Sequence, residues 1–296
     1  MNLEKYLSAQ KEKVDAALER YLNEDRRSSA NLCKAMAYSL KAGGKRIRPV
    51  LVMAGAESVG GNADVVLPIA CALEMIHTFS LIHDDLPAMD DDDLRRGVPT
   101  NHKVFGEGVA VLAGDGLLAE AFYLMCRPEF VRKIKPELLL EVVRDIAEAT
   151  GPRGMVGGQV LDLEGEGKKI NLEQLEKIHQ HKTGALIAVS VTSGAKLSGA
   201  TEDQITALDH YGRAIGLSFQ IADDILAVVG NEKEMGKRVG NDEARAKSTY
   251  PALLGLAGAK QKAEAATASA IQALTIFGSQ ADPLRELAHY IIARTQ

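Results

Sequence analysis

The chain has 296 residues, of which 46% are hydrophobic and 25% charged, a composition that is ordinary for a globular protein and argues against a disordered or fibrous one. Its 40 acidic residues outnumber its 35 basic ones, and a net charge of −5 without any Trp gives no reason to expect nucleic acid as a partner. The three cysteines lie far apart without CxxC spacing, so the sequence indicates neither a disulfide framework nor a zinc site.

The N-terminal segment 1–22 has the pattern of an amphipathic helix. It lacks the basic start and the apolar core that a secretory signal needs. No stretch reaches about 18 uninterrupted apolar residues, the usual length of a transmembrane helix. We therefore expect no membrane span and a cytoplasmic protein.

Apolar residues recur at three- and four-residue steps over most of the chain, which is the pattern of amphipathic and buried helices. The clearest periodic segments are 63–86, 134–150, 171–198, 202–229 and 280–293. Turn signals rich in Gly, Pro and Asn separate the segments, and no low-complexity linker or internal repeat divides the chain. Long helices favour a bundle with a cavity between them. The predicted fold is all-α, a single domain over 1–296 with about ten or more helices around a central cavity.

A first acidic cluster closes the apolar helix predicted over 63–86. From Asp84 the sequence is DDLPAMDDDD, six aspartates within ten residues. A solvated acidic loop is the plain interpretation. Carboxylates this dense at the end of an apolar helix instead favour a bound divalent cation such as Mg²⁺. Because Pro87 opens the helical ladder, Asp84 and Asp90 could converge on one metal ion from two sides of a bend.

A second acidic pair, Asp223 and Asp224, lies inside the apolar segment 209–229. Two carboxylates in such a helix are costly to bury unless they are paired or bound to metal. Gln220 and Asp223 are three residues apart, so their side chains share a face of the helix.

Basic residues punctuate the chain at predicted helix ends. The glycines of segment 43–49, GGKRIRP, let backbone approach an anion, and Arg suits the geometry of phosphate. Arg95 and Arg96 follow the first acidic run, Lys182 interrupts an apolar helix, and a glycine-flanked loop at 236–242 carries further basic groups. Each of these residues alone is more often a surface charge. Together with the two acidic clusters, they predict a cavity for two diphosphates, one held through Mg²⁺ and one through Lys and Arg.

His77 lies seven residues before Asp84, nearly two helical turns, so both side chains face the same way. A lone His is usually a satisfied core residue. The shared face favours the alternative that His77 touches bound substrate.

The motifs together resemble the bacterial farnesyl diphosphate synthases, which are short-chain trans-isoprenyl diphosphate synthases. The matching segments follow the family's order from end to end: GGKRIRP at 43–49, HTFSLIHDDLPAMD at 77–90, LRRGVPTNH at 94–102, GMVGGQVLDL at 154–163, KTGAL at 182–186, FQIADDIL at 219–226, and GKRVGND with KSTYPALLG within 236–255. The resemblance implies condensation of isopentenyl diphosphate with dimethylallyl diphosphate and geranyl diphosphate to give farnesyl diphosphate. It also implies a homodimer and several Mg²⁺ ions, with Mn²⁺ as an alternative.

The resemblance implies roles for individual residues. Asp84, Asp90 and Asp223 would coordinate the metal ions that hold the allylic diphosphate. Arg95, Lys182 and Lys237 would bind oxygens of that diphosphate, whereas Lys45, Arg48, His77 and Arg96 would hold isopentenyl diphosphate. Thr183 and Gln220 would face the developing carbocation with their oxygen dipoles. The predicted catalytic set is Asp84, Asp85, Lys182, Thr183 and Gln220.

Product length is predicted to depend on Phe79 and Ser80, which lie below the first acidic cluster. Phe79 is five residues before Asp84, about 7.5 Å along the helix axis, so its ring would block a tail longer than farnesyl. An aromatic residue there, with the inserted Pro87-Ala88, resembles the bacterial farnesyl type. Plain core packing is the alternative reason for Phe79, and both can hold at once.

One residue departs from the family's pattern. The second acidic motif is usually DDxxD, but here it is DDILA, with Ala227 in the last place. We predict weaker Mg²⁺ affinity or slower turnover rather than an inactive enzyme, because Asp223 is still present. A geranylgeranyl synthase and a class I terpene cyclase are alternative activities. A weakly active or non-catalytic partner subunit is the alternative that Ala227 supports.

Overall fold

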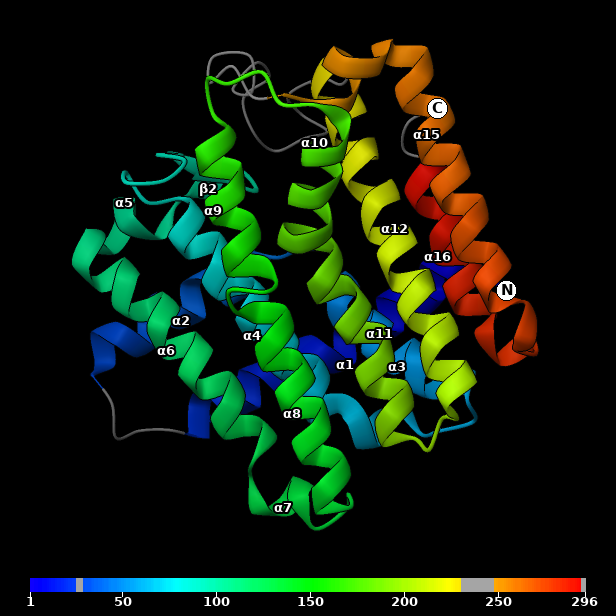
Figure 1. Cartoon of the computed structure of the whole chain (residues 1–296). Helices are drawn as coiled ribbons and strands as arrows, with labels where there is room; N and C mark the ends of the chain where they lie inside the picture. Colours follow the sequence, from blue (N-terminus) through cyan, green and yellow to red (C-terminus); the bar gives the residue numbers. More distant parts are fainter. Residues whose placement is uncertain (25–28, 230–247, 294–296) are drawn as a thin grey trace.

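The computed structural model describes residues 1–24, 29–229 and 248–293, and this part of the chain is almost entirely helical (Figure 1). The long helices are α1 (Leu3–Glu24), α2 (Ala30–Lys41), α3 (Ile47–Ser58), α4 (Ala63–Asp84), α6 (Glu107–Met125), α8 (Pro136–Thr150), α9 (Met155–Gly165), α10 (Leu172–His179), α11 (Ala185–Leu197), α12 (Glu202–Val229), α15 (Tyr250–Ala273) and α16 (Asp282–Ala293). Shorter elements are α5 (Asn101–Phe105), α7 (Pro128–Val131), the π-helix η1 (Gln180–Gly184) and the 3₁₀ turns η2 (Leu274–Ile276) and η3 (Ser279–Ala281). The predicted all-α fold with ten or more helices is confirmed.

The most apolar helices lie in the interior. Helices α3, α4 and α11 are apolar on nearly all sides, the pattern of a helix that is covered all round. In Figure 1, α6 lies at one outer edge, and α15 and α16 lie at the opposite edge beside α12. Gly55 of α3 and Gly194 of α11 allow these two helices to touch, because a Cβ atom on either glycine would overlap a carbonyl oxygen of the other helix. The close crossing holds the middle of α3 against α11, and the basic motif lies at the start of α3.

Two stretches are long and apolar enough to cross a membrane by length and composition, Ala63–Asp84 and Glu107–Val131. The sequence did not predict these two stretches as spans, because charged residues interrupt the apolar run in each of them. In the first stretch, 67% of the most apolar window is buried inside the fold, as in the core helix of a globular protein. In the second, the buried share is 39%.

One small β-hairpin, β1 (Leu94–Arg95) with β2 (Val98–Pro99), follows the first acidic cluster. The predicted all-α fold did not include this hairpin, because two-residue strands are too short to show an alternating pattern. Arg96 and Gly97 connect the strands with φ values of 54° and 80°, the positive values that a tight two-residue hairpin turn requires. The hairpin turns Arg96 toward the loop that precedes α3.

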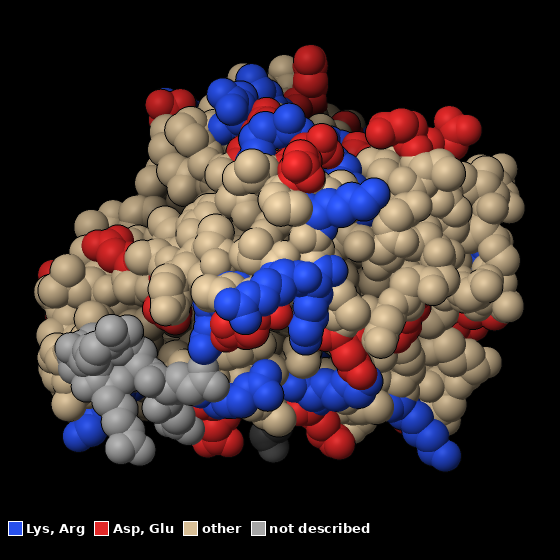
Figure 2. Space-filling model, turned by 90° about the horizontal axis from the view of Figure 1, so that it is seen from below, with Lys and Arg blue, Asp and Glu red and all other residues tan. Residues whose placement is uncertain are grey.

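The face of the molecule seen in Figure 2 carries charges of both signs. Lys and Arg side chains lie interleaved with Asp and Glu side chains across it.

Candidate active site

A cavity of about 1300 Å³ lies between the start of α3, the second half of α4, α9, η1, α12 and the start of α15. Most of the predicted site residues line it: Lys45, Arg48, His77, Phe79, Ser80, Asp84, Asp90, Arg95, Arg96, Lys182, Thr183, Gln220 and Asp223. Asp85 does not line this cavity, and Lys237 lies outside the described residues. Segments that are far apart in the sequence therefore bring the two acidic motifs and the basic motifs into one space.

The first acidic cluster folds back on the end of α4. The helix ends at Asp84, and the chain then bends so that the Asp90 backbone N–H donates to the Asp84 carbonyl oxygen over 2.8 Å. The bend predicted from Pro87 is confirmed, and the Asp84 and Asp90 side chains both face the cavity. Burial raises the pKa of Asp84; Lys182 opposes the shift and the charge of Asp90 adds to it. A cation beside these carboxylates would relieve this cost.

Both members of the second acidic pair line the cavity, and one of them also anchors a neighbouring helix. Asp223 and Gln220 line the cavity, as their shared helical face predicts, and Asp224 reaches the cavity wall as well. The neighbouring carboxylate of Asp224 is buried and accepts a hydrogen bond from the Tyr250 backbone N–H over 3.0 Å, which anchors the start of α15. Thr183 Oγ1 donates to Gln220 Oε1 over 3.1 Å, so the two oxygen-bearing side chains predicted to face the carbocation are in direct contact.

The two cations beside the acidic clusters each have a carboxylate partner. Arg95 Nε lies 2.7 and 2.8 Å from the two carboxylate oxygens of Asp85. Burial lowers the pKa of Arg95, but the hydrogen bond and charge of Asp85 outweigh it and the net pKa is raised. Lys182 Nζ lies 2.6 Å from Asp162 Oδ2. Asp85 therefore holds Arg95 from outside the cavity, and its charge also adds to the raised pKa of Asp84.

Lys182 and Thr183 lie in the π-helix η1, within the segment 171–198 that was predicted as continuous helix. A π-helical turn holds one extra residue and often occurs at functional sites. Helix α9 approaches this turn closely, because a Cβ atom on Gly158 would overlap the Lys182 backbone nitrogen. The sequence did not predict this change of helical register, which coincides with the polar residues Lys182 and Thr183 inside the apolar segment.

The opposite side of the cavity carries Lys45, Arg48, His77 and Arg96. Arg48 Nε is inaccessible to solvent and has no hydrogen-bond partner, and burial lowers the pKa of Arg48 to about 10. Burial also lowers the pKa of His77 well below its ordinary range, and the charges of Arg48 and Arg96 act in the same direction, so the imidazole is neutral. A bound anion would supply the partner that Arg48 lacks.

Phe79 forms part of the cavity wall one turn below the acidic cluster. Its ring packs edge-on against His83, with centroids 4.9 Å apart at 77°. His83 Nε2 in turn lies 3.0 Å from the Val111 carbonyl oxygen of α6. Ser80, also in the wall, donates to the His77 carbonyl oxygen over 2.9 Å. The Phe79 ring is therefore held from behind rather than being free to swing.

The model of the polyprenyl synthetase family matches residues 29–279. The chain belongs to the polyprenyl synthetase family. Farnesyl diphosphate synthase of Geobacillus stearothermophilus is 54% identical over 262 residues, which cover 88% of each chain. Geranylgeranyl diphosphate synthase of Cyanophora paradoxa is 44% identical over 294 residues, 99% of this chain and 97% of that one. A crystal structure of a putative farnesyl-diphosphate synthase from Marinomonas sp. MED121 superposes with a TM-score of 0.85 at 43% identity, covering 99% of both chains.

These similarities confirm the predicted enzyme class, a prenyltransferase. They do not separate the two product lengths, because the similar proteins include both a farnesyl and a geranylgeranyl synthase.

The carboxylates of this polyprenyl synthetase fit a metal that is shared with substrate. Among the described residues, no three His, Cys, Asp or Glu side chains lie close enough together to hold a metal ion by themselves. Asp84 and Asp90 lie on one side of the cavity, and Asp223 lies on α12. Mg²⁺ usually takes one or two carboxylates and completes its shell with waters and phosphate oxygens. The donor set therefore suits Mg²⁺ ions that bridge the protein and a diphosphate.

Four residues in or beside the cavity wall had no role in the sequence analysis: Arg46, Glu74, Gln159 and Asp162. Both amide atoms of Gln159 are buried without a hydrogen-bond partner, and Asp162 is the partner of Lys182. Gln159 and Asp162 are three residues apart on one helical face, so their spacing within the matching segment 154–163 was a usable signal. No comparable local pattern points to Glu74, which lies in a wholly apolar stretch of α4.

Proposed function

We propose that the protein is a Mg²⁺-dependent farnesyl diphosphate synthase that condenses isopentenyl diphosphate with dimethylallyl diphosphate and then with geranyl diphosphate. The observation that carries the proposal is the division of one cavity into two sides. One side has carboxylates with paired cations, and the other has an arginine whose Nε lacks a partner. Such a division suits two diphosphates that are bound in different ways.

The acidic side holds the allylic diphosphate. Asp84, Asp90 and Asp223 would hold Mg²⁺, which when bound neutralises charge on the departing diphosphate. Arg95 and Lys182 donate to the oxygens of that group, so they stabilise the negative charge that grows as the allylic C–O bond breaks. Lys237 is proposed for the same task.

The basic side holds isopentenyl diphosphate so that its double bond faces the allylic carbon. Lys45, Arg48 and Arg96 bind the diphosphate by charge, and neutral His77 contributes a hydrogen bond. Thr183 and Gln220 direct oxygen dipoles toward the carbocation. The double bond then forms the new C–C bond, and one proton leaves the isopentenyl unit for the released diphosphate. Holding both reactants in place supplies much of the rate gain.

Phe79, supported by Ser80, is proposed to limit the product to farnesyl. The bracing of its ring by His83 supports this role, since a fixed ring closes the tail end of the cavity. A geranylgeranyl synthase is the alternative, favoured by the Cyanophora paradoxa relative. A weakly active or non-catalytic partner subunit is a second alternative, favoured by Ala227, which lines the cavity one turn after Asp223.

The first test is incubation of the purified chain with Mg²⁺, radiolabelled isopentenyl diphosphate and dimethylallyl diphosphate, beside an Ala227→Asp variant. Farnesyl diphosphate from the parent supports the proposal, and a faster variant locates a cost at the metal site. A longer main product favours the geranylgeranyl alternative. Activity in the variant alone favours the partner subunit, and no product from either chain overturns the proposal.

We further propose that the chain is one domain and acts as a cytoplasmic homodimer, as the resemblance implies. Sedimentation of the purified protein tests the dimer: a monomer at assay concentration that is fully active would contradict it.

A further inference from the structure

Arg46 adopts an unusual backbone conformation at the entrance to α3. Its φ is 53°, in the left-handed region that residues other than Gly rarely occupy, and it lies between the two site cations Lys45 and Arg48. Its side chain is only 4% exposed, although arginine is seldom buried. A strained and buried residue next to a functional loop needs surroundings that hold it in place.

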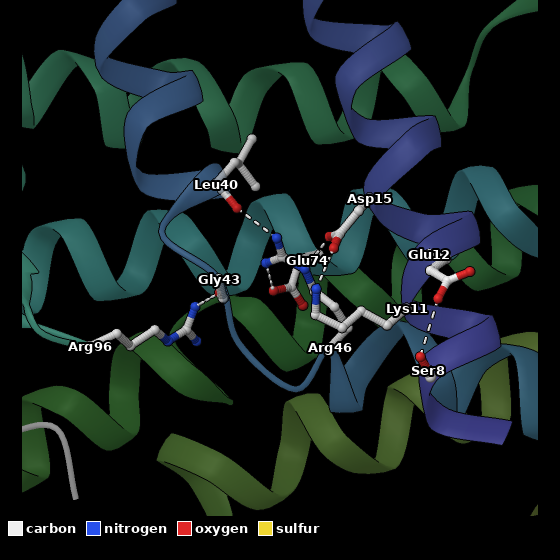
Figure 3. A network of polar contacts seen from close by, with 9 residues as sticks. All are labelled: Ser8, Lys11, Glu12, Asp15, Leu40, Gly43, Arg46, Glu74 and Arg96. Atoms are coloured by element: carbon white, nitrogen blue, oxygen red, sulfur yellow. Dashed lines mark hydrogen bonds and ion pairs between the residues drawn. The ribbon is translucent and has the colours of Figure 1, made fainter. Parts of the chain in front are cut away.

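The guanidinium of Arg46 is held by three different helices (Figure 3). Nε donates to Asp15 Oδ1 of α1 over 2.8 Å, and Nη1 donates to Glu74 Oε1 of α4 over 2.7 Å. Nη2 donates to the Leu40 carbonyl oxygen at the end of α2 over 2.6 Å. Burial lowers the pKa of Arg46, but Glu74 and Asp15 outweigh it, so the group stays charged. We call Arg46, Asp15 and Glu74 the Arg46 network.

Arg46, the centre of the network, occupies the position immediately before α3. The Arg46 carbonyl oxygen accepts the first hydrogen bond of that helix, from the Val50 N–H over 3.0 Å. Arg48 therefore lies in the first turn of α3, two residues after Arg46. Lys45 is the last loop residue before Arg46. Figure 3 shows Arg96 reaching the same loop, where it donates to the Gly43 carbonyl oxygen.

Glu74 supplies the negative charge of this region. It is 2% exposed, lies three residues before His77 on α4, and reaches the cavity wall. Its charge raises the pKa of Arg48 and of Arg96 against the effect of burial. Glu74 accepts its hydrogen bond from Arg46, however, and Arg48 Nε keeps no partner. Glu74 thus stabilises the cluster of arginines without occupying the group that would meet an anion.

We propose that Arg46 and Glu74 are positioning residues for isopentenyl diphosphate: they place Lys45 and Arg48 for its diphosphate and have no such effect on the allylic substrate. This inference rests on the proposed function. It assigns affinity for one of the two substrates to a network that touches neither.

Two variants test the network from both ends. Glu74→Gln keeps shape and removes charge, whereas Arg46→Gly accepts the left-handed backbone without strain and removes the guanidinium. Both should raise KM for isopentenyl diphosphate by about tenfold or more, by analogy with other residues that orient ligand groups. KM for the allylic substrate and the product length should be unchanged.

Glu57→Gln is the matched control. Glu57 also joins α1 to α3, accepting hydrogen bonds from Tyr6 Oη at 2.6 Å and Gln10 Nε2 at 3.2 Å, but it does not line the cavity. This variant should lower Tm and leave both KM values alone. Should Glu74→Gln fail to fold, Asp15→Asn at the half-exposed end of the network provides a milder version of the same measurement.

The outcomes separate the inference from the proposed function. A wild-type chain that does not condense these substrates overturns the proposed function, whatever the variants do. A wild-type chain that is active, with variants that raise both KM values equally or change Tm alone, overturns the inference only. A selective rise for isopentenyl diphosphate in both variants supports it.

Discussion

The two sides of the cavity handle positive charge in opposite ways. On the acidic side, Arg95 and Lys182 each have a carboxylate within 2.7 Å, from Asp85 and Asp162. On the basic side, no carboxylate among the described residues lies within ion-pair distance of Arg48, whose Nε has no partner at all. The cations of the acidic side are therefore satisfied before substrate arrives, and Arg48 is not.

This difference predicts different requirements for the two diphosphates. A paired cation gains little from a new anion, because it must share or exchange its carboxylate. A metal ion can supply the missing attraction on that side. An unpartnered buried guanidinium gains a full charge-assisted bond directly. We therefore expect binding on the basic side without Mg²⁺ and binding on the acidic side only with it.

Removing a carboxylate from the acidic side should have the largest effect. Asp84→Asn is expected to lower kcat by about a thousandfold, because it removes stabilisation of the departing diphosphate. Binding of isopentenyl diphosphate should remain. The matched control is Asp93→Asn in the same acidic run, whose carboxylate is 65% exposed and pairs with Lys103 over 2.7 Å. Steady-state kinetics of both variants measure the effect, and equal losses would contradict the assignment of Asp84.

Removing the unpartnered cation should give the next largest effect. Arg48→Gln should weaken the binding of isopentenyl diphosphate by about 30-fold or more, the cost typical of truncating a buried charged contact. Calorimetric titration in EDTA measures it directly, since the wild-type chain should bind this substrate without metal. Arg144→Gln, at an exposed arginine, is the control. A wild-type chain that binds isopentenyl diphosphate only with Mg²⁺ would remove the contrast between the two sides.

The parts of this site that the sequence could predict are those set by local geometry. Helical periodicity gave α4 and α12 nearly to the residue, and helical spacing correctly placed His77 with Asp84 and Gln220 with Asp223. The bend after Pro87 was predictable because proline acts on its own neighbourhood.

The remaining parts depend on contacts between distant segments. Lys182 of η1 pairs with Asp162 of α9, and Arg46 pairs with Asp15 of α1 and Glu74 of α4. Such pairings follow from the packing of whole helices, so no local pattern specifies them. The π-helix at Lys182 is a shift of backbone hydrogen bonds that leaves apolar periodicity almost intact, which explains why the segment 171–198 was predicted as one continuous helix.

Shortening the side chain of Phe79 in the cavity wall should alter the product length more than the turnover rate. Phe79→Ala removes the ring that His83 braces, so the allylic tail can extend and products longer than farnesyl should accumulate. Both sides of the cavity keep their charges, and turnover should continue. Phe130→Ala, a buried ring on α7 outside the cavity, controls for lost packing. Chromatography of the products gives the answer, and an unchanged product length would assign Phe79 to core packing alone.

The smallest effect concerns two histidines that burial keeps neutral, His77 in the cavity wall and His179 behind it. Burial lowers the pKa of His77 well below its ordinary range and that of His179, beside Lys182, to about 4. Because the unfolded chain binds these protons near pH 6.5 and the folded chain does not, stability is fully present above that pH and falls as the pH drops toward the folded values. Each such histidine should lower the free energy of unfolding by about 1.4 kcal/mol for every pH unit of acidification in that window.

Thermal unfolding between about pH 7.5 and pH 5.5 tests this expectation, at ionic strengths that screen surface charge. Tm should fall on acidification, and His179→Gln should reduce the fall because the group that resists protonation is gone. His77→Gln should also reduce the fall in Tm. It should in addition weaken the binding of isopentenyl diphosphate, since of the two histidines only His77 faces the proposed anion. If the His179 variant weakened binding of that substrate equally, the effect of His77 could not be assigned to contact with the anion.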